Sequence, residues 1–386
     1  MNKTEIYWIW ILQAVSNNSR KVRELVDRLG GIEQVFCASD DDIYQADFLQ
    51  PSEKDEIVKH NTSAAESIYR FCLSKGIELI TYLDDRYPDE LKEIQNPPAV
   101  LFAYGNIDEA FSKPKITIVG TRDSTPYGEI ATAKLSGALA KSGFTLVAGV
   151  ADGIDASAIN AALKVGGSVI AIIPGGHTKT HFTSNYKFKG IPAHGVILSE
   201  NLPDAQVYKS SYHERNRLLS GLSLGVIVTQ APQKSGALIT ARHALDQGKD
   251  VFALPANVDM QQSMGSNLLL RDGAIPVIDH TDVINYYIGA LGHKIKTDVI
   301  FDPNEVSAAM QPDPVEQIDD FRRVAAKALS DDQQIIFKYI GLAPTDINYI
   351  IEQSELPITT VMSTLSELEA EGMIVACPGN KYMIKL

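Results

Sequence analysis

The sequence predicts an α/β protein in which a doubly wound, mostly parallel sheet lies between a small all-α domain and a winged-helix domain. Strand and helix signals alternate from about residue 76 to residue 285, which is typical of a Rossmann-like sheet covered by helices. Short helical segments precede this stretch, and three helical segments with a hairpin follow it. We therefore expect a SAM-like or helix-hairpin-helix-like domain at 1–75, a Rossmann-like domain at 76–289, a linker at 290–325 and a winged helix at 326–386.

The N-terminal region carries helical periodicity interrupted by helix breakers. Leu25, Leu29 and Ile32 follow one helical face, and Gly30-Gly31 separates two helices. The expected helices are 7–15, 20–29, 31–38, 40–44 and 52–75. Two roles stay open for this domain: a DNA contact of the helix-hairpin-helix type, or a docking and packing module, which its acidic residues 40–42 favour.

The central stretch contains short, Val- and Ile-rich segments that are apolar on both sides of the strand alternation. Strands of this kind are buried on both faces of a parallel sheet. The expected strands are 77–81, 99–103, 115–119, 145–148, 168–173, 195–199, 225–229, 250–253 and 275–278. The expected helices between them are 127–142, 154–165, 216–223 and 237–247. Ligands of such sheets bind beyond the carboxyl ends of the strands.

The C-terminal region begins with a linker rich in Pro and Asp and continues with expected helices at 331–340, 345–354 and 359–371. Expected strands at 373–376 and 381–384 complete a winged helix. Its third helix would normally enter DNA. Here that helix carries Glu367, Glu369 and Glu371 and no Lys or Arg, so we expect it to contact a protein partner instead.

The charge distribution places any nucleic-acid surface in the centre of the chain. The 386 residues have a formal net charge of −13. Residues 205–250 nevertheless hold six Lys and Arg against three Asp and Glu, whereas residues 331–386 hold three against eight. A nucleic-acid surface requires local positive charge.

The three cysteines, Cys37, Cys72 and Cys377, form no CxxC pair and no His/Cys cluster. We therefore expect no disulfide framework and no metal site. The sequence also shows no signal peptide and no membrane-length apolar run. These observations favour a cytoplasmic protein, and we expect no cofactor.

Three segments combine small residues with fixed positive charge, which suits a bound phosphate backbone. In the first, Arg122 lies among small and polar residues, and in the second two arginines flank an amide that could contact a base edge. The third opens a helix with a lysine. The candidate DNA-binding residues in these segments are Gly120, Arg122, Thr125, Tyr127, Gly128, Arg215, Asn216, Arg217, Lys234, Ser235 and Gly236.

A fourth glycine turn, at 148–155, adds Gly149, Gly153 and Asp155 to the candidates. The glycines would allow close approach of a backbone or ligand. Asp155 lies early in its expected helix, and a structural role as a cap or loop anchor is favoured over a ligand contact. His177, His181 and His213 are further candidates for stacking or phosphate contact.

Catalytic motifs are absent or misplaced. There is no GxGxxG dinucleotide turn and no GxxxxGK[ST] phosphate loop. The GxSxG match at 221–225 follows a helix and precedes a strand, the reverse of a nucleophile elbow, so Ser223 is interpreted as structural. Pro174-Gly175-Gly176 is similar to the turn of phosphoribohydrolases but lacks their catalytic glutamate. We expect no catalytic residue. A Rossmann-like nucleotide-binding or phosphoribohydrolase-type enzyme is the alternative.

These motifs, in this order, resemble the DNA-processing protein A family (DprA, also called Smf). Residues 120–128, 148–155, 215–223 and 234–256 correspond to its GSRxxTxYG, SGxAxGID, RNRxIxGLS and KSGSLITAxxAxxxGRxVxAxPG segments. The likeness covers roughly residues 80–280. The chain departs from the pattern at several positions, among them Asp152, which replaces an arginine and removes one positive charge.

The resemblance implies a protein that binds single-stranded DNA through its Rossmann-like domain, acts as a homodimer, and loads the RecA recombinase onto DNA taken up in natural transformation. Arg and Lys would hold the phosphates, glycine amides would add hydrogen bonds, and Tyr127 or His213 could stack a base. The acidic winged helix would be free to meet a protein partner. None of these roles requires a covalent step.

Overall fold

The computed structural model describes residues 2–180, 190–297, 299, 329–340, 345–354, 356–371, 373–377 and 379–384. The chain forms two compact units, Met1–Met310 and Gln311–Leu386, which are described separately. Most of the expected linker at 290–325 lies outside the described residues, as does His181. In the described part of the chain, no helix is both long and apolar enough to cross a membrane.

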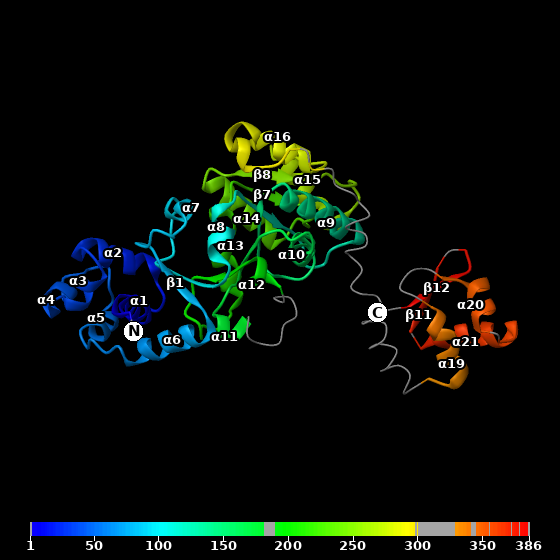
Figure 1. The fold of residues 1–386 in the computed structure, drawn as a ribbon, viewed down its shortest axis with the longest axis horizontal. Helices are drawn as coiled ribbons and strands as arrows, with labels where there is room; N and C mark the ends of the chain where they lie inside the picture. The colour runs from blue at the N-terminus through cyan, green and yellow to red at the C-terminus, as the bar shows by residue number, and fades with distance from the viewer. Residues whose placement is uncertain are drawn as a thin grey trace. The chain divides into compact units, whose positions relative to one another are not determined.

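A nine-stranded sheet with the order β1-β2-β6-β5-β4-β3-β7-β8-β9 forms the centre of the first unit (Figure 1). Its strands are β1 (Glu78–Thr81), β2 (Val100–Gly105), β3 (Lys115–Val119), β4 (Thr145–Ala148), β5 (Val169–Ile172), β6 (Gly195–Ser199), β7 (Gly225–Val228), β8 (Asp250–Ala253) and β9 (Ile275–Pro276). Only the β1–β2 and β2–β6 pairs are antiparallel. The expected strands and the mostly parallel sheet are confirmed.

The strand order reverses between β3 and β7. From β3 the chain adds β4, β5 and β6 on one side, then returns to place β7, β8 and β9 on the other. Strands β3 and β7 pair in parallel, with Thr117 opposite Val226 and Val119 opposite Val228. Their following loops therefore leave the same edge of the sheet and diverge, which opens a crevice at this point.

Helices cover both faces of the sheet because alternate strand residues are apolar on each side. Ile116 and Ile118 of β3 face the core under α9 (Pro126–Lys141), α10 (Ile154–Lys164) and α16 (His280–Leu291). Val119 faces the opposite core, which α13 (Lys209–Gly221) and α14 (Gly236–Asp246) cover. Shorter elements complete the layers: α7 (Asp89–Lys92), α8 (Ile107–Ser112), α11 (His177–Thr180), α12 (Ile191–His194), η2 (Gln261–Ser263), α15 (Met264–Arg271) and η3 (Gly292–Lys294).

Helix α13 is seven residues longer at its start than the expected helix at 216–223. Its first two turns, Lys209 to Asn216, are almost entirely polar. A helix whose first turns face solvent shows no apolar stripe in the sequence, so periodicity alone does not find it. Because the helix begins before Arg215, both Arg215 and Arg217 lie within it, and their directions follow from its helical geometry.

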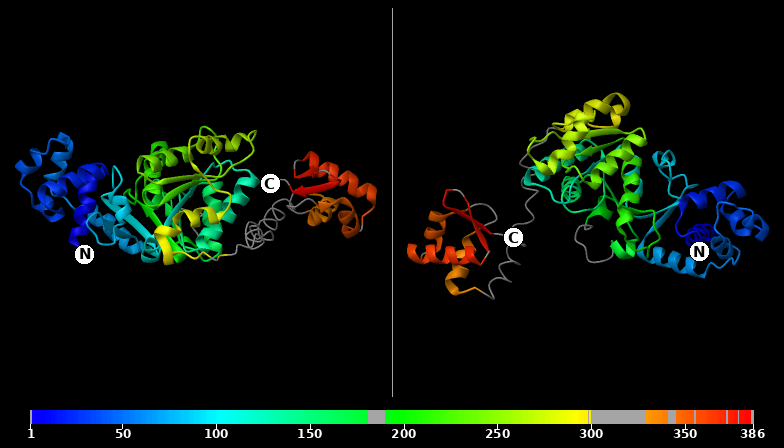
Figure 2. Two further views of the ribbon diagram at one scale, coloured as in Figure 1. Left: turned by 90° about the horizontal axis from the view of Figure 1, so that it is seen from above. Right: turned by 180° about the vertical axis from the view of Figure 1, so that it is seen from behind.

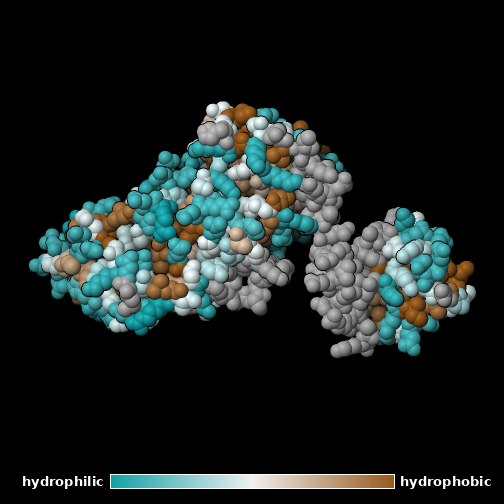
Figure 3. All heavy atoms as spheres, viewed as in Figure 1, coloured by the Kyte–Doolittle hydropathy of each residue, from teal (hydrophilic) through white to brown (hydrophobic). Residues whose placement is uncertain are grey.

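The N-terminal helices gather at the β1–β2 edge of the sheet (Figure 2). They are α1 (Lys3–Ala14), α2 (Ser19–Leu29), α3 (Ile32–Cys37), α4 (Asp40–Tyr44), α5 (Pro51–Ile57) and α6 (Ser63–Lys75). Trp8 and Leu12 share one core with Val100 and Phe102 of β2. The outer face of these helices is mainly hydrophilic in Figure 3.

The expectation of one helix at 52–75 is wrong. The chain breaks between α5 and α6, where His60 adopts a left-handed backbone with φ 47°. Asn61 then accepts a hydrogen bond from the Ser63 N–H at 3.1 Å. A side chain that satisfies an early helical N–H favours a new helix start over a continuous helix.

The second unit is a winged helix. It contains α19 (Asp331–Tyr339), β10 (Thr345–Asp346), α20 (Ile347–Ser354), α21 (Ile358–Ala370), β11 (Ile374–Cys377) and β12 (Lys381–Ile384). The antiparallel strands have the order β10-β12-β11. Phe337, Val361 and Leu365 form the centre of its core. The expected helix at 345–354 begins instead with the short strand β10.

Candidate nucleic-acid interface

A cleft of about 640 Å³ opens where β3 and β7 diverge. The loop after β3, the loop after β7, the start of α10 and the polar first turns of α13 enclose it. The predicted site residues that line it are Gly120, Arg122, Asp155, Arg215, Asn216, Lys234, Ser235 and Gly236. Segments that are about 120 residues apart in the chain therefore meet at one place, the edge of the sheet expected for a ligand.

The loop after β3 is held by Gln230, which follows β7 and is fully buried. The Thr121 N–H donates to the Gln230 carbonyl at 2.7 Å, and the Thr125 N–H donates to Gln230 Oε1 at 2.8 Å. Thr125 Oγ1 in turn caps α9 by accepting from the Gly128 N–H at 3.2 Å. The sequence analysis missed Gln230, although a polar residue so close to the end of a buried strand is a signal of such a role.

The glycines of this loop are required by close packing. A Cβ at Gly120 would collide with Ile154 and with the Gln230 carbonyl, and a Cβ at Gly128 would collide with the Gln230 side chain. Gly153 has φ +71° and lies against the backbone of Thr121 and Arg122. Gly120 and Gly153 therefore let the loops after β3 and β4 pack against each other, whereas Gly128 lets the start of α9 pack against Gln230. Of the three, only Gly120 lines the cleft.

Asp155 and Arg215 form the buried floor of the cleft. Asp155 Oδ2 accepts hydrogen bonds from the Gly149 N–H at 3.1 Å and the Ala151 N–H at 3.4 Å. The Arg215 guanidinium donates to the Gly149 carbonyl at 2.6 Å and also to the Ile172 carbonyl. These contacts tie the ends of β4 and β5 to α13. A Cβ at Gly149 would collide with both side chains.

Burial governs the ionisation of this floor. Burial lowers the pKa of Arg215 to about 10, although the nearby charge of Asp155 acts to raise it. It also raises the pKa of the Asp155 carboxyl, which the Arg215 charge and the two N–H donors oppose. Asp155 thus holds backbone and side chain together, as expected for a structural residue.

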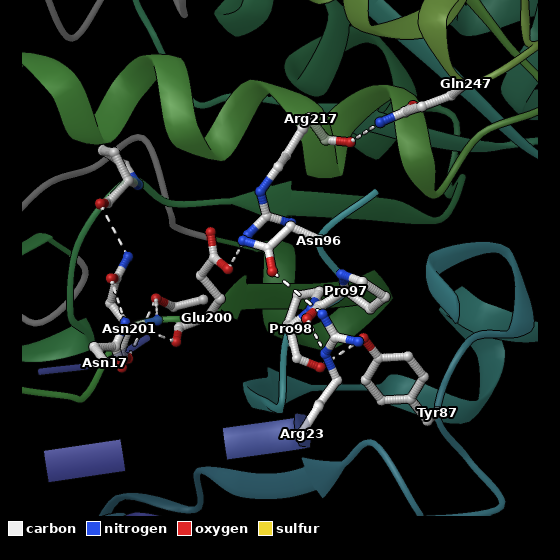
Figure 4. Close-up of polar contacts among 12 residues, drawn as sticks. Asn17, Arg23, Tyr87, Asn96, Pro97, Pro98, Glu200, Asn201, Arg217 and Gln247 are labelled. Atoms are coloured by element: carbon white, nitrogen blue, oxygen red, sulfur yellow. Dashed lines mark hydrogen bonds and ion pairs between the residues drawn. The ribbon is translucent and has the colours of Figure 1, made fainter. Parts of the chain in front are cut away.

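Arg217 lies outside the cleft, contrary to the expectation that it holds a phosphate together with Arg215. Its guanidinium pairs with Glu200 (Figure 4). The two side chains are only 15% and 12% exposed. The pair lies near the junction with the N-terminal helices, where Asn17 donates to the Glu200 carbonyl and Arg23 donates to Pro97 O. Two residues of a helix are about 200° apart around its axis, so Arg215 and Arg217 point in opposite directions.

Tyr127 also lies outside the cleft. Its hydroxyl donates to Pro255 O at 3.0 Å, and its ring borders a separate hollow of about 520 Å³ that Ile130, Leu254 and Ile278 also line. Among the candidates for stacking, His213 lines the cleft. His177 is buried, and its Nε2–H donates to Phe102 O at 3.0 Å.

The exposed charges of the cleft are all positive. Arg122, Lys209 and Lys234 are exposed, and no described residue forms an ion pair with their side chains. The Arg122 guanidinium lies 4.8 Å from the centre of the Tyr212 ring. Lys209 and Tyr212 belong to the first turns of α13, which the sequence analysis did not predict as helix.

The start of α14 adds further positive potential. Ser235 caps this helix by accepting from the Ala237 N–H at 3.2 Å, and Gly236, its first residue, is exposed in the cleft wall. The free N–H groups and the macrodipole of a helix favour a bound anion at this end. Lys234 and the helix start therefore act on the same volume.

The motifs considered for catalysis lie in the interior. Ser223 is fully buried, and its hydroxyl is 2.7 Å from Thr117 Oγ1. Burial lowers the pKa of His177 to about 4, so its imidazole is neutral at pH 7. Over the described ranges, no three His, Cys, Asp or Glu side chains cluster as metal ligands would.

Comparison with known proteins identifies the family. Residues 78–288 match the model of DNA recombination-mediator protein A, and residues 322–380 match the DprA winged helix domain. Protein Smf of Synechocystis sp. is 35% identical over 80% of each chain.

Two solved structures share the fold. DNA processing protein A from Streptococcus pneumoniae superposes with a TM-score of 0.64 at 29% identity, over 72% of this chain and 97% of that one. The protein from Helicobacter pylori, whose structure addresses its single-stranded DNA binding mode, gives 0.50 at 32% identity, over 56% and 98%. Family models that match in both units, together with a relative that is 35% identical over 80% of each chain, show that this chain belongs to the DNA recombination-mediator protein A family.

Proposed function

We propose that the cleft between the β3 and β7 loops binds single-stranded DNA, and that the chain acts as a recombination mediator without a chemical step of its own. The observation that carries this proposal is the convergence of Arg122, Lys209 and Lys234, all without carboxylate partners among the described residues, on one hollow. Unpaired cations at a concave surface attract a polyanion and release its counterions.

Aromatic side chains in the same wall favour a single strand over a duplex. Tyr208 is 66% exposed, and Tyr212 and His213 follow it on α13. Bases stack on aromatic rings only when their faces are free, as in an unpaired strand. The Helicobacter pylori relative, which binds single-stranded DNA, supports the same assignment.

The carboxylate in the cleft does not suit acid–base catalysis. A general acid or base must reach the proton that it transfers, whereas Asp155 is buried and already accepts from two backbone N–H groups. This geometry favours binding over the phosphoribohydrolase-type alternative.

The test is a salt titration of binding to labelled dT oligonucleotides by fluorescence anisotropy. We expect affinity to fall steeply with salt, with a slope of log K against log salt of about −0.7 for each phosphate contact. The Arg122→Ala/Lys234→Ala variant should lose about 100-fold, since a hydrogen bond to a charged group contributes about 1.5–3 kcal/mol.

The matched control is Arg70→Ala/Lys75→Ala on α6, which removes two cations from the N-terminal region. It should bind as the wild type does. Equal affinity of the cleft variant and this control would exclude the cleft as the DNA site.

We further propose, from the family resemblance, that the protein is a homodimer that delivers RecA to DNA during natural transformation in the cytoplasm. The acidic end of α21 supports a protein partner for the winged helix, because Glu367 and Glu369 in its last turn and Glu371 directly after it are exposed. Light scattering would test the dimer. A RecA-dependent strand-exchange assay, with and without residues 326–386, would separate RecA delivery from the contribution of the winged helix.

A further inference from the structure

We propose that the DNA strand held in the cleft continues over the outer face of α14, into a second hollow that ends at Arg242. This inference rests on the proposed function of the cleft. The second hollow, about 650 Å³, shares Lys209, His213, Lys234, Ser235 and Gly236 with the cleft. The two hollows are therefore one continuous groove around the start of α14.

The second hollow combines a cation with an apolar floor. Arg242 is exposed, and its side chain has no hydrogen-bond or ion-pair partner among the described residues. Leu238 and Leu269 form part of the floor, and Leu245 is 62% exposed beside them. An apolar surface with a cation at its end suits a nucleotide, whose base is flat and apolar and whose phosphate is charged.

The groove is long enough to hold more than the phosphates in the cleft. Gly236 and Arg242 are six residues apart on one helix, which corresponds to about 9 Å along its axis. This exceeds the roughly 3.4 Å between base steps along one strand of B-form DNA. Arg242 can therefore contact a phosphate that the cleft cations do not reach. The one acidic residue of α14, Asp246, does not prevent this, because it lies about one turn beyond Arg242 and is not part of the hollow.

The occupant is assigned from charge and continuity. A polyanion leaving the cleft past Lys209 and Lys234 meets Arg242 as the next exposed cation of the hollow. An apolar protein segment would gain nothing from this row of unpaired cations, whereas a DNA strand satisfies both the charges and the apolar floor. The unpaired charge of Arg242 and the apolar floor beside it thus favour a DNA strand as the occupant.

The experiment compares two oligonucleotide lengths on the same variants. Fluorescence anisotropy is measured with dT oligomers of about 2 and about 16 nucleotides, because at about 3.4 Å per base step the dinucleotide cannot span the roughly 9 Å between Gly236 and Arg242. We expect Arg242→Ala to weaken binding of the long oligomer about tenfold and to reduce its salt slope by about 0.7. Binding of the short oligomer, which the cleft holds, should stay within twofold of wild type.

Two controls make the outcome decisive. Arg70→Ala removes an exposed arginine from α6. It should leave the affinity for both oligomers unchanged. Leu245→Ala keeps every charge and should weaken only the long oligomer. The second hollow is not part of the path of the DNA strand if the Arg242→Ala variant binds the long oligomer as tightly as the Arg70→Ala variant does. The same conclusion follows if Arg242→Ala lowers the affinity for both oligomers equally. If the cleft variant Arg122→Ala/Lys234→Ala also binds both lengths normally, the proposed function itself is wrong.

Discussion

Two regions that α13 joins show what the same residue type does in different surroundings. At the cleft, Arg122 and Lys234 are exposed and have no carboxylate partner among the described residues. At the junction with the N-terminal helices, Arg217 is largely shielded from solvent and pairs with Glu200. The charge is the same in both places, but only the first is available to a ligand. A buried cation mainly holds structure, and its loss leaves its partners unpaired.

The largest expected effect concerns Arg215, at the boundary between the two regions. Arg215→Ala leaves the Gly149 and Ile172 carbonyls without a donor and Asp155 without its nearby positive charge. We expect the free energy of unfolding of the first unit to fall by about 4 kcal/mol. Urea denaturation followed by tryptophan fluorescence would report this, because both tryptophans, Trp8 and Trp10, lie in α1.

Arg122→Ala is the matched control in that measurement. It should leave the urea midpoint unchanged, since the side chain is exposed, lies against the Tyr212 ring and has no ion-pair partner among the described residues. Similar midpoints for Arg215→Ala and the wild type would contradict the structural role of Arg215.

The second prediction concerns the junction. Arg217→Met leaves Glu200 buried without its partner and should lower the free energy of unfolding by about 3 kcal/mol. The double variant Arg217→Met/Glu200→Leu should recover most of this loss, because an apolar pair of similar size can replace a buried ion pair. DNA affinity of the folded double variant should equal that of wild type. A large loss of affinity would show that Arg217 serves the cleft.

The third prediction separates interior from cleft by pH. Burial lowers the pKa of His177 to about 4, against about 6.5 in an unfolded chain. As the pH falls, the unfolded state therefore binds the proton before the folded state does. The contribution of neutral His177 to the free energy of unfolding is thus fully present above pH 6.5 and is lost as the pH falls toward 4. The loss amounts to about 3 kcal/mol over that range.

His177→Gln keeps an N–H donor near Phe102 O but does not titrate. Its stability should decline less than that of wild type between pH 6.5 and pH 4, as measured by urea midpoints at each pH. An identical pH profile in the two proteins would remove His177 as the cause.

The smallest expected effect belongs to the aromatic wall of the cleft. Tyr212→Ala removes a ring that could stack a base and that supports Arg122. We expect a loss of about 1 kcal/mol in affinity for dT oligomers, with no change in salt slope, because stacking involves no counterion. Tyr212→Phe should bind as wild type does. A reduced salt slope in Tyr212→Ala would mean that the ring acts by positioning the Arg122 charge.

Much of the fold was predictable because it depends on patterns close in the chain. The strand at 168–173 was found because residues 169–172 are apolar on both sides, and β5 (Val169–Ile172) is buried on both sides in the sheet. The first two turns of α13 were missed because residues 209–216 have no apolar period. Gln230, which fixes the Thr125 loop from 105 residues away, carries no local sequence signature of its partner.

The sequence by itself determined the alternation of strands and helices, the glycine turns and the residues that could carry charge to a phosphate. Tertiary structure alone decided which of those charges are free. Arg215 and Arg217 have the same residue type and the same local sequence surroundings, but α13 turns by about 200° between them. It directs one toward buried carbonyls and the other toward Glu200. A residue's availability depends on neighbours that folding brings from distant segments, and that information is not local to its position in the sequence.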